Sequence, residues 1–263
     1  MTTAASMGRV LIVAGSDSGG GAGVQADLKT CMALGAYAGT AITALTAQDT
    51  HGVKGVFPVP PAFVQQQMLA VLDDIGADAV KTGMLGDAAV IDAVAAVLSG
   101  RHLPLVLDPV MVAKGGARLL DPAALHALRR LIPLATLLTP NIPEAEALLG
   151  HPIPDASAAL TAAPALLALG ARAVLLKGGH LPGPTTKDIL ATASGLETLE
   201  NPRIDTRHTH GTGCTLASAI AAGLSQGLPL SEAVRRARRY VQSAIAAAPG
   251  LGGGHGPLNH AVL

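Results

Sequence analysis

Short, continuously apolar runs alternate along this chain with longer segments in which apolar residues recur at the helical period. A strand that is apolar on both sides must be covered on both sides, which is typical of a parallel sheet between two layers of helices. We therefore predict an α/β protein with a three-layer α/β/α fold and a mostly parallel central sheet. The predicted strands are residues 10–14, 79–82, 105–107, 136–139 and 173–176. The predicted helices are residues 23–34, 61–75, 88–98, 122–131 and 157–169.

The remainder of the chain adds a hairpin and two helices to this pattern. Residues 187–193 and 197–201 flank Ser194-Gly195, which indicates a β-hairpin. Two further helices are predicted at residues 214–226 and 230–248. No stretch rich in Pro, Gly or Ser is long enough to be a linker, so we predict a single domain over residues 1–263. Ligands of an open parallel sheet bind beyond the carboxyl ends of its strands, so the residues after each strand are the functional candidates.

The composition argues against several classes of function. Hydrophobic residues make up 49% of the chain and aromatic residues 2%, so the core is expected to be aliphatic. The 18 Lys and Arg residues balance 18 Asp and Glu residues, which argues against a basic surface for nucleic acid. The two cysteines, Cys31 and Cys214, are far apart and favour a reduced intracellular protein. Because no apolar run approaches the length of a membrane span, we predict a cytoplasmic protein with no membrane or nucleic-acid partner.

A glycine-rich turn follows the first predicted strand, from Gly15 to Gly23. Glycines allow a ligand to approach the backbone closely, and the start of the next helix can bind an anion. The turn lacks the Gly-Lys-Ser/Thr ending of a P-loop, and Val24 stands where a dinucleotide-binding fingerprint has its last glycine. The pattern alone is equally compatible with a tight connection between a strand and a helix.

Polar side chains follow the third and fourth predicted strands. Asp108 comes directly after one of them, and Asn141 and Glu144 follow the other. Their oxygens could converge on a hydrated Mg²⁺, which prefers oxygen ligands. Alternatively, Asn141 caps the helix that begins at Ile142, with Glu144 at the third helical position. The spacing supports both interpretations.

Two further segments carry candidate phosphate ligands. Lys177 leaves the last apolar strand into a Gly-Gly turn, where its ammonium could reach phosphate oxygens or simply face solvent. Gly211 and Gly213 precede an alanine-rich helix, so successive backbone N–H groups there could form an anion hole. Cys214 would lie in the first helical turn, where a lowered pKa lets a thiol act as a base or as a thiolate. The alternative is that Cys214 is a small buried core residue.

Six short segments, spread over nearly the whole chain, carry a resemblance to a known family. The segments are residues 14–27 (AGSDSGGGAGVQAD), 46–48 (TAQ), 108–111 (DPVM), 177–180 (KGGH), 209–214 (THGTGC) and 254–260 (GHGPLNH). Each segment alone is of low specificity, but their combination is highly specific. Together, and in this order, they resemble the hydroxymethylpyrimidine/phosphomethylpyrimidine kinase family.

The resemblance implies a ribokinase-like fold and ATP-dependent phosphoryl transfer with Mg²⁺ as the cofactor. It implies two successive reactions in thiamine biosynthesis, from 4-amino-5-hydroxymethyl-2-methylpyrimidine to its monophosphate and then to its diphosphate. It also implies a homodimer. In sugar kinases of this superfamily an aspartate base follows the anion-hole glycine, and the pyrimidine kinases have a cysteine there, which corresponds to Cys214 in this chain.

The resemblance also assigns roles to individual residues. The catalytic residues it implies are Lys177, Gly211, Thr212, Gly213 and Cys214, and the last four would stabilise charge on the transferring phosphoryl group. The implied metal residues are Asp108 and Glu144, and the implied nucleotide residues are Asn141, Lys177, Arg207 and Thr209. Gln48 would recognise the pyrimidine, in a pocket lined by Gly15, Ala22, Asp27, Met84 and Val110.

The sequence departs from the family pattern at two places. Asp49 replaces the Asn that usually follows the Gln, and Arg207-His208 replaces a Lys-Asn or Lys-Asp pair. Neither change removes the implied chemistry. A pyridoxal or pyridoxine kinase of the same superfamily is the alternative enzyme, and the glycine-rich turn with Gln48 favours the pyrimidine. A non-catalytic pyrimidine-binding protein is disfavoured because Lys177, Gly211, Gly213 and Cys214 are all present.

Overall fold

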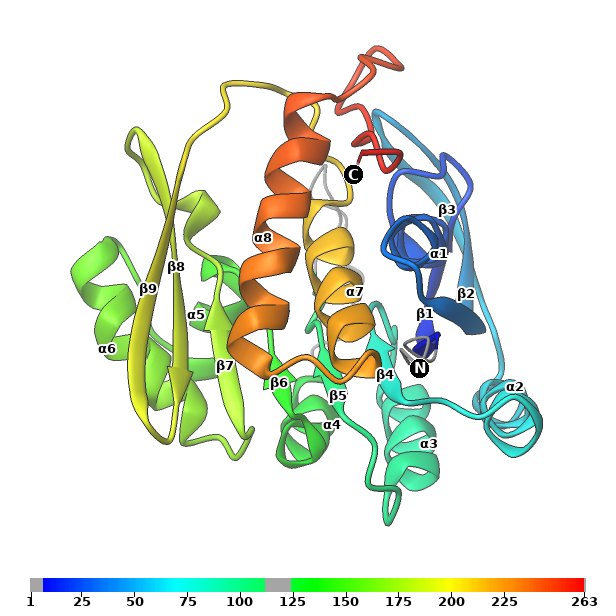
Figure 1. Cartoon of the computed structure of the whole chain (residues 1–263). Coiled ribbons are helices and arrows are strands. Elements are labelled where there is room, and N and C mark those ends of the chain that lie inside the picture. Colours follow the sequence, from blue (N-terminus) through cyan, green and yellow to red (C-terminus); the bar gives the residue numbers. More distant parts are fainter. Residues whose placement is uncertain (1–6, 112–123, 263) are drawn as a thin grey trace, which may run out of the picture.

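A nine-stranded sheet forms the centre of the molecule within residues 7–111 and 124–262, which the structure, a computed structural model, describes (Figure 1). The strand order is β3-β2-β1-β4-β5-β6-β7-β8-β9. The strands are β1 (Arg9–Asp17), β2 (Tyr37–Asp49), β3 (Gly52–Pro58), β4 (Ala79–Thr82), β5 (Leu105–Leu107), β6 (Leu137–Leu138), β7 (Ala173–Leu176), β8 (Thr185–Thr192) and β9 (Gly195–Pro202). Neighbours from β2 to β7 run parallel, and β3, β8 and β9 pair antiparallel at the two edges. The predicted mostly parallel sheet is confirmed.

Helices cover both faces of this sheet (Figure 1). One face carries α1 (Gly23–Ala33), α7 (Thr212–Ser225) and α8 (Leu230–Ala246). The other carries α2 (Pro61–Asp74), α3 (Ala88–Leu98), α4 (Ala124–Leu131), α5 (Ile142–Leu149) and α6 (Ala156–Leu167). Two 3₁₀ turns, η1 (Ile132–Leu134) and η2 (Gly178–His180), complete the described elements. The predicted α/β/α architecture is therefore confirmed, and no helix in the described ranges is long and apolar enough to span a bilayer.

The apolar side chains of the inner strands divide between two cores, one on each face of the sheet. In β1, Leu11 and Val13 belong to the core under α2–α6, and Val10 and Ile12 belong to the core under α1, α7 and α8. All four side chains are at most 1% exposed. The side chains of successive strand residues point to opposite faces, so a continuously apolar strand fills both cores. This is why the apolar runs of the sequence predict the inner strands well.

The predicted elements agree with the structure in their inner parts and differ at their ends. The predicted helices that are fully described begin and end within two residues of the observed ones. The predicted helix 122–131 is described only from Ala124, because residues 122 and 123 lie outside the described residues. The predicted hairpin is β8–β9, which closes at the pair Thr192 and Gly195. The predicted strand 136–139 is only Leu137–Leu138.

The hairpin of β2 and β3 was not predicted from the sequence, and the strand predicted at residues 10–14 extends to Asp17. The side chains of β2 beyond Ala44 and those of β3 are exposed or half-buried, so the hairpin has no continuous apolar run. This arrangement matters for the site, because β1 and β2 stay paired beyond the point where the other parallel strands end. The pair Asp17 and Thr46 is in register, and Gln48 follows two residues later.

Candidate active site

A cavity of about 610 Å³ lies beyond the carboxyl ends of the parallel strands. It brings together most of the residues that the sequence nominated. Those that line it are Gly15, Ala22, Gln48, Met84, Asp108, Val110, Asn141, Glu144, Lys177, Thr209, Gly211, Thr212, Gly213 and Cys214. These residues come from β1 and the loop after it, from the end of β2, from the segments after β4, β5, β6 and β7, and from the start of α7. Asp27 and Arg207 do not line it.

The N-terminus of α7 opens into the cavity without a side-chain cap. Its N-cap residue is Gly211, whose φ of 84° lies in the left-handed region. A Cβ there would overlap the carbonyl oxygen of Gly21, so the position accepts only glycine. The N–H groups of a first helical turn have no partner inside the helix, and the helix dipole adds positive potential at the same place. The arrangement suits a phosphoryl group, as the sequence pattern predicts.

Cys214 lies in the first turn of α7 and is a free, partly exposed cysteine. Burial of the thiol raises its pKa to about 11. The charge of Lys81 opposes this rise, and the charges of Asp27 and Asp108 add to it. The sequence-based expectation of a lowered pKa is therefore wrong, because local burial outweighs the benefit of the helix start. At neutral pH Cys214 is a protonated thiol in this structure.

Asp108, Glu144 and Lys177 form a charged cluster on the cavity wall. Lys177 Nζ donates to Asp108 Oδ1 at 2.9 Å and lies 4.0 Å from Glu144 Oε2. Asp108 Oδ1 also accepts a hydrogen bond from Thr139 at 3.0 Å. A Cβ on Gly213 would lie 3.3 Å from Lys177 Nζ, so this cluster adjoins the start of α7. Burial alone would lower the pKa of Lys177, but Asp108 and Glu144 raise it above its usual value and keep the ammonium charged.

Asn141 and Glu144 confirm the capping interpretation that the sequence left open, and the metal interpretation stays a prediction. They form a capping box at the start of α5, with Asn141 Oδ1 accepting from Glu144 N at 2.9 Å and Glu144 Oε2 accepting from Asn141 N at 2.8 Å. Both also line the cavity. Burial raises the pKa of Glu144 to about 7, with Lys177 opposing and Asp108 adding to the rise.

The donor set of this cluster suits Mg²⁺. Two buried carboxylates face a single ammonium, so the cluster attracts a further cation. No group of three or more His, Cys, Asp or Glu residues within the described ranges could hold a metal by itself. Mg²⁺ needs no such cage, because it is usually held by one or two carboxylates together with water and substrate phosphates.

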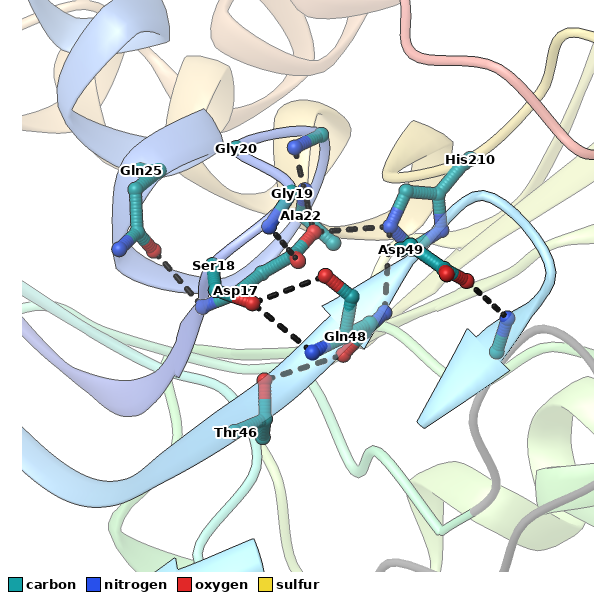
Figure 2. A network of polar contacts seen from close by, with 12 residues as sticks. Asp17, Ser18, Gly19, Gly20, Ala22, Gln25, Thr46, Gln48, Asp49 and His210 are labelled. Carbon is teal, nitrogen blue, oxygen red and sulfur yellow. Dashed lines mark hydrogen bonds and ion pairs between the residues drawn. The ribbon is translucent and has the colours of Figure 1, made fainter. Parts of the chain in front are cut away.

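Another part of the cavity wall holds Gln48, around which a polar network forms (Figure 2). Asp17 Oδ1 accepts from Gly19 N at 2.8 Å, and Oδ2 accepts from Ala22 N at 2.8 Å. His210 Nε2 lies 2.8 Å from Asp17 Oδ2 and 3.3 Å from Gln48 Nε2. Asp17 and His210 were not predicted as site residues, although both lie inside the segments that carry the family resemblance.

Asp27 forms a buried ion pair beneath the cavity, which corrects its predicted place in the pocket wall. Its Oδ2 accepts from Lys81 Nζ at 2.7 Å, and its Oδ1 accepts from Ser218 at 2.6 Å. The side chains of Asp27 and Lys81 are both 0% exposed. Asp27 lies on α1, and its side chain points into the core, where it bonds to Lys81 and Ser218. Arg207 is exposed, and its guanidinium approaches the carbonyl of Gly253 at 3.4 Å.

The sequence model of the family described as phosphomethylpyrimidine kinase matches residues 17–259. The chain belongs to this family. It is 57% identical over 255 residues to the thiamine biosynthesis bifunctional protein of Geobacter sulfurreducens, covering 96% of this chain and 52% of that protein. It is 51% identical over 252 residues to the hydroxymethylpyrimidine/phosphomethylpyrimidine kinase of Streptomyces coelicolor, covering 95% of this chain and 93% of the relative.

Among solved structures, an ADP complex of Bacillus subtilis pyridoxal kinase superposes with a TM-score of 0.91 at 39% identity. The superposition covers 97% of this chain and 98% of that one. The ribokinase-like fold and the kinase activity predicted for a member of the phosphomethylpyrimidine kinase family are thus confirmed.

Proposed function

We propose that this kinase transfers the γ-phosphoryl group of ATP to 4-amino-5-hydroxymethyl-2-methylpyrimidine, and then phosphorylates the monophosphate to the diphosphate, in thiamine biosynthesis. One observation carries the proposal. The Gln48 amide, the open N-terminus of α7 and the Asp108–Lys177–Glu144 cluster all border the same cavity of about 610 Å³. The cavity therefore offers a hydrogen-bonding amide for a base and an anion site for a phosphoryl group.

Gln48 is the proposed recognition residue for the base. An aminopyrimidine presents an exocyclic NH₂ donor beside a ring-nitrogen acceptor, and a primary amide offers the complementary pair. Gly15, Ala22, Met84 and Val110 are proposed to line this pocket. A Cβ on Gly15 would overlap the Met84 methyl group, so the pocket wall is tight there. Pyridoxal has no amino group beside a ring acceptor and would leave part of the amide unmatched.

The proposed phosphate machinery lies at the other part of the wall. Backbone N–H groups of residues 211–214 are proposed to stabilise charge on the transferring phosphoryl group, together with the positive charge of Lys177. Asn141, Thr209 and Arg207 are proposed to contact the nucleotide. Arg207 does not line the cavity and would make its contact from outside it. Mg²⁺, held by Asp108 and Glu144, would neutralise phosphate charge. The thiolate form of Cys214 is proposed to accept the hydroxyl proton.

We also propose that the protein acts in the cytoplasm as a single-domain homodimer. Both cysteines are free, as expected in a reducing compartment. The continuous sheet supports one domain. Apolar side chains on β2 and β3 are exposed, with Phe57 at 68%, and these favour burial against a second copy. Sedimentation equilibrium tests the dimer, and a monomer at micromolar concentration would contradict it.

The function is tested by ATP consumption with three acceptors: the aminopyrimidine alcohol, its monophosphate, and pyridoxal. We expect both pyrimidines to be phosphorylated with higher kcat/KM than pyridoxal. The similarity to a pyridoxal kinase structure makes pyridoxal the necessary competitor. If kcat/KM were higher for pyridoxal than for both pyrimidines, pyridoxal would take the place of the pyrimidine as the substrate. If no ATP were consumed with any of the three acceptors, the proposal would be contradicted.

A further inference from the structure

The backbone of Gln48 is held in one place, which leaves the orientation of its amide as the open variable. Gln48 N donates to Ser18 Oγ, and Ser18 Oγ donates to Gln48 O, both at 2.8 Å (Figure 2). This reciprocal pair fixes the end of β2 to the loop after β1. A half-turn about the last side-chain bond exchanges the amide O and NH₂ with almost no change in shape. The neighbours of the amide therefore decide which side is the donor and which the acceptor.

The first neighbour is His210, whose Nε2 can carry only one hydrogen. Asp17 Oδ2 is 2.8 Å from this nitrogen and already accepts from Gly21 N at 3.1 Å and Ala22 N at 2.8 Å. Burial alone would raise the pKa of Asp17, but hydrogen bonds from His210 and the backbone lower it below its usual value. A carboxylate can only accept, so the hydrogen must be on His210 Nε2. His210 therefore has no lone pair there for a Gln48 N–H, and the one hydrogen on Nε2, which points to Asp17, can only be shared with an acceptor on the amide.

The second neighbour is Thr46, whose hydroxyl also carries one hydrogen. Thr46 Oγ1 donates to the carbonyl oxygen of Ser16 at 2.8 Å, and that oxygen can only accept. The same hydroxyl lies 3.3 Å from the atom placed as Gln48 Oε1. With its hydrogen on Ser16 O, Thr46 Oγ1 has only lone pairs for the amide. The side of the amide that faces Thr46 must therefore be the NH₂ donor.

We infer that Asp17, His210 and Thr46 are positioning residues that hold the Gln48 amide in one orientation, with Oε1 toward His210 and Nε2 toward Thr46. This is a half-turn of the amide from the placement in which Nε2 lies 3.3 Å from His210 Nε2 and Oε1 lies 3.3 Å from Thr46 Oγ1. This inference rests on the proposed pyrimidine substrate and adds the residues that set its recognition. In this orientation the exocyclic amino group of the substrate donates to Oε1 on the His210 side, and the ring nitrogen accepts from Nε2 on the Thr46 side. The network selects the order of donor and acceptor, whereas a freely turning amide would accept either order.

The test uses two alcohols that differ only in this order. One is the 4-amino-pyrimidine, and the other is 5-hydroxymethyl-2-methylpyrimidin-4(3H)-one, which has an acceptor C=O and a donor ring N–H in the same places. The measured quantity is the ratio of their kcat/KM values with ATP. We expect the wild type to prefer the amino compound strongly, because the other order leaves buried groups unmatched.

His210→Leu removes the donor that holds Oε1, so the amide can turn. We expect the ratio to fall roughly tenfold or more, the factor that corresponds to about 1.4 kcal/mol. His210→Gln can still present an N–H to Asp17 and to the amide, and should restore most of the ratio. Thr46→Val removes the acceptor on the other side and should lower the ratio several-fold in an otherwise similar fold. If His210→Leu is unstable, Thr46→Val carries the same test.

His260→Leu is the matched control. His260 is 8% exposed, as is His210, and bonds to the hydroxyl of Thr215 at 3.0 Å, but it does not line the cavity. Its replacement should leave the ratio unchanged whatever it does to stability. An unchanged ratio in active His210→Leu and Thr46→Val, or an equal fall in His260→Leu, would overturn the inference. A wild type that phosphorylates neither alcohol would instead contradict the proposed function.

Discussion

The two parts of the cavity wall differ in how fully their polar groups are satisfied. Around Gln48, each donor of the Asp17 and His210 network has an acceptor within hydrogen-bond distance. Around Lys177, two buried carboxylates share one ammonium. The first part is therefore preorganised for a neutral, planar ligand before anything binds. The second part is electrostatically incomplete and needs a cation and phosphates to balance it.

The buried Asp27–Lys81 pair lies beneath both parts of the cavity wall. Among the variants considered, loss of this pair should have the largest effect, and the effect should be on stability. The pair joins α1, β4 and, through Ser218, α7, so it ties together the two helices that start at the cavity. Lys81→Met leaves a buried carboxylate without its cation, and we expect the free energy of unfolding to fall by about 3–5 kcal/mol. Chemical denaturation measures it. Lys187→Met, at an exposed pair with Glu200, is the control and should cost at most about 1 kcal/mol.

The next largest effect should come from Lys177→Met. Loss of this charge removes stabilisation of the transferring phosphoryl group, so kcat should fall by roughly 10²–10³. The two carboxylates would then lack their ammonium, so half-maximal activity should need less Mg²⁺ than in the wild type. Steady-state rates over a Mg²⁺ titration measure both. A normal kcat would mean that the ammonium only balances Asp108 and does not serve the phosphate.

Cys214→Ala should lower kcat by about 10² and change KM for the pyrimidine much less, if the thiol accepts the proton. The raised pKa of about 11 gives a second readout. A base works only when deprotonated, so kcat/KM of the wild type should rise with pH from 7 toward 11, and this rise should vanish in Cys214→Ala. An unchanged kcat in the folded variant would leave catalysis to the backbone N–H groups.

Glu144→Gln should have a smaller effect, which is limited to the Mg²⁺ concentration that the enzyme needs for activity. With a pKa of about 7, Glu144 loses its charge as the pH falls through 7, so the Mg²⁺ requirement should rise on the acid side. In Glu144→Gln the requirement should be roughly tenfold higher at pH 8 and no longer depend on pH in this range. Asp108→Asn should raise it at every pH. If Glu144→Gln only lowers the melting temperature, the carboxylate is a helix cap alone.

The sequence predicted the inner strands and the residues of the phosphate part of the cavity wall well, because both depend on local patterns, whereas the roles of these residues stay predictions. Apolar runs mark strands that fill two cores, and glycines with Lys177 or Cys214 after a strand mark an anion site. At the recognition part, Gln48 and four of the five residues predicted to line its pocket do line the cavity, but the sequence missed Asp17, His210 and the hairpin β2–β3. The exposed hairpin β2–β3 has no apolar run, and the contact of Asp17 with His210 joins residues 193 positions apart. The prediction of a lowered pKa for Cys214 was wrong for a related reason. Burial by residues distant in the sequence raises this pKa more than the local helix start lowers it.

The most direct test of the difference between the two parts is calorimetric binding of the aminopyrimidine alcohol without nucleotide or Mg²⁺. A preorganised recognition part should bind the alcohol under these conditions, and Lys177→Met should bind it with nearly the same affinity. Gln48→Leu should lose most of this binding, whereas Asp49→Asn should change it little, because Asp49 Oδ2 pairs with Lys54 and Oδ1 accepts from backbone N–H groups of the turn. Binding that required Mg²⁺ and nucleotide, or that survived in Gln48→Leu, would contradict the account.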